Sequence, residues 1–81
     1  MSKKDILDRI EINPKVCHGK PVIRNTRIPV ALILGFLAAP QSFEEILSEY
    51  PGLTREDIIA AIGFGSYLAG FESLTYENLA Q

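Results

Sequence analysis

The sequence contains few of the residues on which small enzymes and metal proteins depend. Its 81 residues include one cysteine, Cys17, one histidine, His18, and no tryptophan. A single cysteine cannot form an internal disulfide, which agrees with a reducing compartment. A zinc site needs three or four protein ligands, so these two residues alone cannot build one. We expect no metal and no cofactor, and interpret the pair as a turn histidine beside a small buried thiol.

Long hydrophobic runs are also missing. No apolar stretch reaches the ~18 residues that a membrane-spanning helix requires. The start, MSKKDILDRI, returns to acidic residues before any apolar run of the kind found in a signal peptide. Both absences favour a cytoplasmic protein. With 81 residues and 47% hydrophobic composition, the chain predicts a single domain, 1–81, with one small core, so we expect a homodimer or a complex that covers further apolar surface.

No group of side chains predicts an enzyme. Cys17 and His18 are adjacent, and in an extended chain neighbouring side chains point to opposite faces, so they are poorly placed as a nucleophile and its base. The acidic pairs Glu44-Glu45 and Glu56-Asp57 fall at expected helix starts, where they complement the positive end of the helix dipole. We therefore predict a protein without catalytic residues.

Positive charge is scarce after residue 30. Residues 1–30 contain seven Lys or Arg against three Asp or Glu, a balance of +4, whereas residues 31–81 contain one against seven, a balance of −6. The net charge of −2 therefore conceals a division between two surfaces. One surface can meet an anion, and the other repels it.

The hydrophobic pattern predicts a two-stranded β-ribbon over residues 9–28. Charged and apolar residues alternate in Arg9–Ile12, which predicts a strand with Ile10 and Ile12 on one face. The β-branched pair Val22-Ile23 predicts a second strand, and Gly19 before it suits a turn. Two strands alone are marginal in water, so the ribbon must pack on helices or pair with a second chain.

Three helices are predicted over residues 29–69, followed by a C-terminal tail, 70–81. The first begins near Pro29 and ends near Ala39, because Pro40 restricts the residue before it. Capping boxes start the other two: Ser42 with Glu45, and Thr54 with Asp57; the third extends to about Ala69. The apolar positions expected in the core are Val30, Ile33, Leu34, Leu37, Phe43, Ile46, Leu47, Tyr50, Ile58, Ala61, Ile62 and Leu68. Gly63 and Gly65 leave open whether this helix packs closely against a neighbour or is weak.

The short connection Pro51–Leu53 is typical of a helix-turn-helix, so the fold class expected is mainly α, a three-helix core of the winged or homeodomain-like kind. In that arrangement Thr54 and Arg55 approach DNA bases. Carboxylates crowd both helices, so phosphate contacts must come from the ribbon. The candidate phosphate-binding residues are Lys20, Arg24 and Arg27, with Lys15 beside them and Lys3, Lys4 and Arg9 behind. Alternatively, these cations are solvated edge charges that keep a short ribbon from aggregating.

The segments GKPVIRNTRIPV and EEILSEYPGLTREDI resemble a bacterial family catalogued as domain of unknown function 433, and the resemblance extends from about Ile10 to Leu68. It implies a small homeodomain-like or winged helix-turn-helix protein. Many members are thought to be antitoxins encoded beside a PIN-like ribonuclease toxin, which they mask, and to regulate their own promoter. No enzyme activity is attached to the family.

Three positions depart from the family pattern. Asn25 stands where the family has glycine, and asparagine tolerates a positive φ, so the turn should survive. Ala39-Pro40-Gln41 replaces the usual glycine between the first two helices, and residues 63–66, GFGS, replace an alanine-rich stretch. The change at residues 63–66 bears on how the third helix packs.

Two functional hypotheses remain open. In the first, a homodimer binds duplex DNA through the ribbon and the third helix, and the same chain neutralises a PIN-like toxin protein. In the second, the chain is a protein-interaction or dimerisation module that binds no nucleic acid. The second is favoured by the acidic half of the chain and by the aromatic tail, in which Phe71 and Tyr76 are the candidate partner-binding residues.

Overall fold

The computed structural model of the protein describes residues 1–70. The candidate partner-binding residues Phe71 and Tyr76, like most of the predicted tail, lie outside this part. The elements in chain order are α1 (Lys3–Asp8), β1 (Ile10–Glu11), the 3-10 helix η1 (Cys17–Gly19), β2 (Val22–Ile23), α2 (Val30–Ala38), α3 (Phe43–Glu49) and α4 (Arg55–Leu68). The prediction of a mainly helical chain with a small antiparallel ribbon is confirmed.

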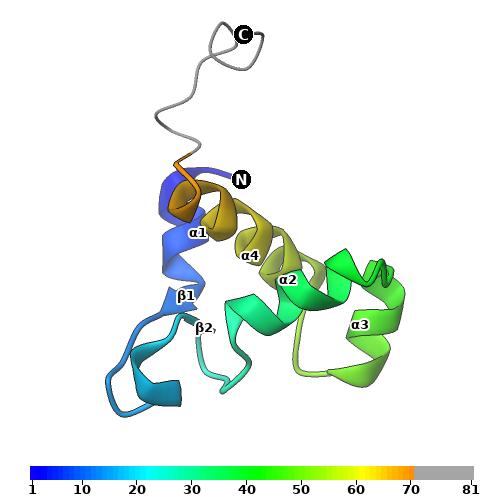
Figure 1. Cartoon of the computed structure of the whole chain (residues 1–81), viewed down its shortest axis with the longest axis horizontal. Helices are drawn as coiled ribbons and strands as arrows, with labels where there is room; N and C mark the ends of the chain where they lie inside the picture. The colour runs from blue at the N-terminus through cyan, green and yellow to red at the C-terminus, as the bar shows by residue number, and fades with distance from the viewer. Residues whose placement is uncertain (71–81) are drawn as a thin grey trace, which may run out of the picture.

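The longest helix, α4, holds the other elements together. It contacts α1, α2, α3 and β1 (Figure 1). The ribbon and α1 lie towards one end of the molecule, and α3 lies at the other. Among residues 1–70, no helix is both long and apolar enough to cross a membrane.

The ribbon is shorter than its sequence pattern predicts. β1 pairs antiparallel with β2 in the register Ile10↔Ile23 and Glu11↔Val22. Ile10 is buried, whereas Ile12 lies beyond the strand and is 60% exposed, so the prediction that both lie on one face is wrong. The strand stops at Glu11, and the chain turns away before the alternation can return Ile12 to the core.

Helix α1 was not predicted from the sequence. Ser2 caps this helix, since its side chain accepts a hydrogen bond from the Asp5 amide at 3.1 Å. The signal was present as Ser-x-x-Asp at residues 2–5, the same pattern that located two later helices. Its buried residue, Ile6, packs into the core beside α4. The N-terminal cations Lys3 and Lys4 therefore lie on a helix and not on the ribbon.

The three predicted helices are confirmed to within a residue or two. Pro29 is the N-cap of α2, and Ser42 and Thr54 cap α3 and α4 with complete capping boxes. The core contains apolar side chains from α1, both strands and all three of these helices, including the fully buried Ile33, Ile46 and Ile58. Residues so far apart in sequence meet because α4 presents buried side chains to each neighbour.

Two expected core positions on α4 are exposed. Ile62 is 40% exposed and Leu68 is 68% exposed, so their assignment to the core is wrong. Ile62 lies on the side of α4 that no described element covers, and Leu68 lies at the last turn of the helix. The helical spacing was correct, but the apolar positions extend further around and along α4 than the core does.

The two internal glycines of α4 allow close packing by neighbouring side chains. A Cβ on Gly63 would collide with the side chain of Ile6 on α1, and one on Gly65 would lie 2.9 Å from Leu34 Cδ1 on α2. Real Cβ atoms essentially never lie this close to another atom. Gly63 and Gly65 are therefore positions where a neighbouring helix packs closely, and not signs of a weak helix.

Candidate functional site

The first turn of α4 presents two of the predicted DNA-binding residues, and both are engaged within the chain. Thr54 Oγ1 accepts a hydrogen bond from the Asp57 amide at 3.2 Å, and Asp57 Oδ2 accepts one from the Thr54 amide at 3.0 Å. Thr54 is itself exposed. The Thr54 hydroxyl oxygen already accepts the capping hydrogen bond of α4, although the hydroxyl hydrogen can still be donated to a ligand.

Arg55 is held by the preceding helix. Its Nη1 lies 3.2 Å from Glu44 Oε1, and its guanidinium stacks over the Phe43 ring at 4.8 Å from the centroid. The ion pair is exposed, so it contributes little to stability. It nevertheless neutralises the one cation that the second half of the chain contains. A phosphate or base edge would have to compete with Glu44 for this side chain.

A second ion pair joins the ribbon to α4. Arg9 Nη1 donates to Asp57 Oδ1 at 3.0 Å, and the Asp57 side chain is only 11% exposed. One carboxylate thus closes the capping box of α4 and binds the residue that precedes β1. Arg9 was predicted to be one of the cations behind the ribbon, but its charge is paired inside the chain. The three-residue spacing from Thr54 to Asp57 predicted the capping box. No local pattern predicts that Asp57 also binds Arg9, which lies 48 residues away in the chain.

The turn after β2 contains Arg24, whose side chain holds the ribbon in place. Its Nε donates to the Asp8 carbonyl at 2.6 Å, and its Nη2 donates to the Ile10 carbonyl at 2.9 Å. The next residue, Asn25, has φ of 65°, as expected from its place in the turn. Thr26 Oγ1 closes the turn by donating to the Ile23 carbonyl at 2.6 Å. Arg24 is therefore first a structural residue.

Lys20 and Arg27 are the predicted phosphate-binding residues whose charges remain available. Both are exposed, and neither side chain has a hydrogen bond or ion pair with another described residue. Arg27 lies in the turn after β2, near Arg24 in the chain, whereas Lys20 lies before β2, at the edge of an apolar groove against α2. The structure thus places Thr54 and Arg55 together at one helix start, Arg24 and Arg27 in one turn, and Lys20 apart from both pairs in the chain.

Cys17 and His18 do not lie in an extended segment, as the sequence analysis assumed. Both adopt positive φ angles, 50° and 56°, in the 3-10 turn η1. Cys17 Sγ lies 3.5 Å from the Arg27 carbonyl, to which it donates. Within residues 1–70, no three His, Cys, Asp or Glu side chains gather in a group suited to a metal ion. The turn therefore places the Cys17 thiol against a backbone carbonyl of the loop after β2.

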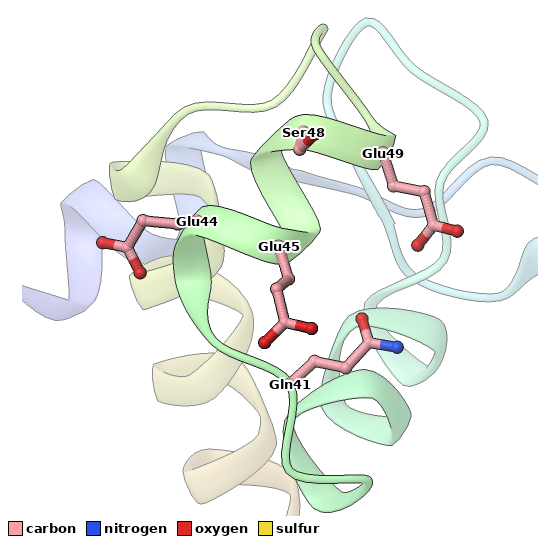
Figure 2. A pocket seen from close by; sticks show the side chains of 5 residues that line it. All are labelled: Gln41, Glu44, Glu45, Ser48 and Glu49. Carbon is pink, nitrogen blue, oxygen red and sulfur yellow. The ribbon is translucent and has the colours of Figure 1, made fainter.

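An open acidic depression of about 470 Å³ lies along α3. Its lining side chains are Gln41, Glu44, Glu45, Ser48 and Glu49. Figure 2 shows Glu45 and Glu49 extending towards Gln41, while Glu44 extends to the opposite side. Glu45 Oε1 accepts from the Ser42 amide at 3.1 Å, as the capping box requires. These carboxylates give the outer surface of α3 a negative potential that repels a polyanion such as DNA.

The solvent side of α4 carries apolar side chains. Arg55, Ile59, Ile62 and Ser66 follow at spacings of four, three and four residues, so they lie on one side of the helix, here called the α4 face. Ile59 and Ile62 are 41% and 40% exposed. In a helix-turn-helix, the corresponding helix presents polar groups to base edges. The α4 face offers two isoleucines and a paired arginine.

A comparison with protein families identifies the chain. The family model described as protein of unknown function (DUF433) matches residues 10–64, which is more than half of the chain. This chain belongs to the DUF433 family. The match includes both strands, α2, α3 and most of α4, so the ribbon and the helix-turn-helix elements lie within the family segment, whereas α1 lies outside it.

Two relatives show how this DUF433 chain compares with others. A crystal structure of a DUF433 member from Anabaena variabilis has a TM-score of 0.70 and 38% sequence identity, and the comparison covers 96% of this chain and 74% of that chain. The uncharacterized protein y4eO of Sinorhizobium fredii is 39% identical over 46 residues, which are 57% of this chain and 21% of y4eO. This chain therefore spans about a fifth of the length of that curated relative.

Proposed function

We propose that this DUF433 chain acts by binding another protein, and that the partner packs on the α4 face. The observation that carries the proposal is the pair of half-exposed isoleucines, Ile59 and Ile62, on the side of α4 that no described element covers. Exposed apolar side chains grouped on one helix face are a feature of protein-binding surfaces. Two of the groups that would read DNA, Thr54 and Arg55, are already engaged within the chain.

The charges around the α4 face indicate the chemistry of the partner. Exposed carboxylates border it: Glu56 lies on α4 itself, and Glu44 pairs with Arg55 at its start. A complementary partner has an apolar patch with basic residues around it. A ribonuclease needs a basic surface to bind RNA, so a PIN-like ribonuclease meets this description. Masking such a surface is the action expected of an antitoxin, the role that the family resemblance implies.

Calorimetric titration of the purified chain with a purified PIN-like ribonuclease tests the proposal. An Ile62→Asp substitution should weaken binding at least about tenfold, since it removes buried apolar area and places a charge in the contact. The matched control is Leu32→Asp on α2, because Leu32 is 38% exposed and lies outside the α4 face. Equal affinities for Ile62→Asp and the unsubstituted chain would reject the α4 face as the contact.

DNA binding is the second candidate, and a separate observation favours it. Residues 12–43 contain no Asp or Glu, and this segment holds the exposed Lys20 and Arg27. In this proposal the two cations contact phosphate, Thr54 and Arg55 approach the bases, and a homodimer regulates its own promoter. The available charge is small, so the affinity depends on contributions from two copies.

A salt titration with duplex DNA from the promoter region decides this candidate. Phosphate contacts make the logarithm of the affinity fall linearly with the logarithm of salt concentration, by about 0.9 for each neutralised phosphate. Arg27→Glu should reduce that slope, and Glu49→Gln, which changes a charge outside the ribbon, is the control that should not. Arg24 is left unchanged because it holds the ribbon. An affinity that does not change with salt would exclude phosphate contacts.

A further inference from the structure

Helix α2 lies within the longest apolar run of the sequence. Residues 28–40 contain no polar side chain. An apolar run of about 10–14 residues is typical of a helix that is buried on all sides. The core of the chain covers one side of α2, where Val30 and Ile33 are buried, and leaves the other side open. The sequence of α2 is therefore that of a more deeply buried helix than the single chain provides.

The open side of α2 carries only small and apolar residues. We call it the α2 face, and its exposed residues are Ala31, Leu32, Gly35, Ala38 and Ala39. Leu32 is its largest side chain and is 38% exposed. The exposed positions of α1, α3 and α4 within residues 1–70 all include charged side chains. Among the α-helices of this part of the chain, α2 alone exposes a surface without charge.

Gly35, at the centre of the α2 face, has no packing role within the chain. A glycine inside a helix costs about 1 kcal/mol relative to alanine. At Gly63 and Gly65 a neighbouring side chain occupies the space that a Cβ would need, so close packing accounts for both. At Gly35 nothing lies within 4 Å of an added Cβ. A glycine at this position is explained by the close approach of another molecule.

Opposite charges flank the two ends of the α2 face. At its start, Lys20 lines a small groove together with Ala31, and the Lys20 side chain has no hydrogen bond or ion pair with another described residue. At its end, the Gln41 amide donates to a carbonyl of the last turn of α2 at 2.9 Å. Gln41 also lines the acidic depression, and Figure 2 shows Glu45 and Glu49 extending towards it. The α2 face therefore has a basic start and an acidic end.

From these observations we propose that the α2 face binds a second copy of this chain, with the two α2 helices running in opposite directions and crossing at Gly35. Ala31 and Ala39 lie four residues before and after Gly35. A two-fold axis at Gly35 thus places the start of each α2 face opposite the end of the other. Because neither glycine has a side chain, the two helix axes can approach to about 8 Å.

Charge complementarity favours a second copy as the occupant. The reversed direction brings Lys20 of each copy beside Glu45 and Glu49 of the other, so the same contact between opposite charges is made twice. The uncharged centre of each face meets an identical uncharged centre. The contact goes beyond the proposed function, because the ribonuclease partner binds Ile59 and Ile62 on a different helix.

Sedimentation of the full chain across a concentration series tests the dimer. Leu32→Asp should raise the dimer dissociation constant at least about 100-fold, because the contact occurs twice and each buried leucine contributes about tenfold. Leu7→Asp is the matched control, since Leu7 is 43% exposed and lies on α1, and it should leave the constant unchanged. Ile62→Asp should also leave it unchanged, whereas Leu32→Asp should not alter the affinity for the ribonuclease. The two contacts can therefore fail independently.

A charge exchange tests the direction of the two helices. Lys20→Glu should weaken the dimer about fivefold, since two exposed contacts between opposite charges become repulsive. Glu49→Lys added to the same chain should restore most of the affinity, because each contact then joins opposite charges again. Both effects should diminish as salt is raised. Lys20 and Glu49 are exposed, so these variants remain informative if Leu32→Asp prevents folding.

A disulfide at Gly35 tests the crossing point. In a chain with Cys17→Ala and Gly35→Cys, the two-fold axis brings the two cysteines within the Cα separation of about 4.4–6.8 Å that a disulfide needs. Oxidation should link the copies, whereas a chain with Cys17→Ala and Leu7→Cys should stay unlinked.

Three results would overturn the proposal. The first is an unsubstituted chain that is monomeric at about 100 μM, a concentration at which even a weak dimer is populated. The second is an equal effect of Leu32→Asp and Leu7→Asp on the dimer. The third is a failure of Glu49→Lys to restore the affinity that Lys20→Glu removes. If Leu32→Asp weakens the ribonuclease contact and not the dimer, the α2 face belongs to that partner and the proposal is wrong.

Discussion

The carboxylate of Asp57 joins three parts of the fold, which makes its removal a sensitive test of the structure. Its Oδ2 accepts from the Thr54 amide at 3.0 Å, and its Oδ1 lies 3.0 Å from Arg9 Nη1. Loss of a capping interaction removes about 1 kcal/mol. Loss of a partly buried ion pair removes about 1 kcal/mol more, because Asp57 is shielded while Arg9 remains 39% exposed.

We therefore expect Asp57→Ala to lower the free energy of unfolding by about 2 kcal/mol. For a domain of this size that corresponds to a fall in Tm of about 8–16 °C. Urea unfolding followed by circular dichroism measures the change at constant m-value. The double substitution Arg9→Met with Asp57→Ala should show a coupling energy of about 0.5–1 kcal/mol.

Glu45→Ala supplies the matched control for this prediction. Glu45 occupies the same position in the capping box of α3, but no cation pairs with it among residues 1–70. We expect a loss of at most about 1 kcal/mol. If Glu45→Ala and Asp57→Ala destabilise the chain equally, the link between Arg9 and α4 contributes nothing and the reasoning is wrong.

Three further predictions follow from single positions, each measured by urea unfolding. Gly63→Ala should be less stable than Gly35→Ala by at least about 1 kcal/mol, because a Cβ at Gly63 meets a buried side chain while none lies within 4 Å at Gly35. Asn25→Gly should be neutral or slightly stabilising and Asn25→Val should cost about 1–2 kcal/mol, since φ is 65°; equal effects would contradict the assigned turn. Arg24→Ala should cost about 1–2 kcal/mol and Arg24→Lys should restore little, whereas Arg27→Ala should change stability by less than about 0.5 kcal/mol. Similar losses at Arg24 and Arg27 would show that the carbonyl contacts are unimportant.

Helix starts were predictable because their signals are local. Ser42 with Glu45, and Thr54 with Asp57, are three residues apart, so the capping interaction is complete within one turn. Asn25 was predictable for the same reason, because a positive φ depends on the residue itself. Ser2 and Asp5 have the same three-residue spacing at the start of α1, so this helix was also predictable from a local signal.

The extent of the core could not be predicted from the same patterns. Ile62 and Leu68 continue the helical spacing of α4, yet burial depends on which elements lie opposite, and none of the described ones covers either side chain. The spacing identifies apolar positions without distinguishing a core contact from a surface contact. One of the two errors therefore coincides with a surface proposed for binding, since Ile62 belongs to the α4 face.

Charge available to a ligand was the least predictable property, because it depends on contacts between distant residues. The chain has eight Lys and Arg residues. Lys4, Arg9 and Arg55 form ion pairs with carboxylates, and Arg24 donates to two carbonyls. Lys3 lies over the Tyr67 ring.

Three cations, Lys15, Lys20 and Arg27, then remain for a polyanion, since eight less these five leaves three. Glu44, one of the carboxylates of the acidic depression, pairs with Arg55 at the start of α4, the helix that would have to enter the groove of DNA. A few available cations in the loops around η1 and β2 support weak phosphate binding, while an acidic, partly apolar helix supports docking of a basic protein. The balance between the two proposed functions therefore favours the protein partner.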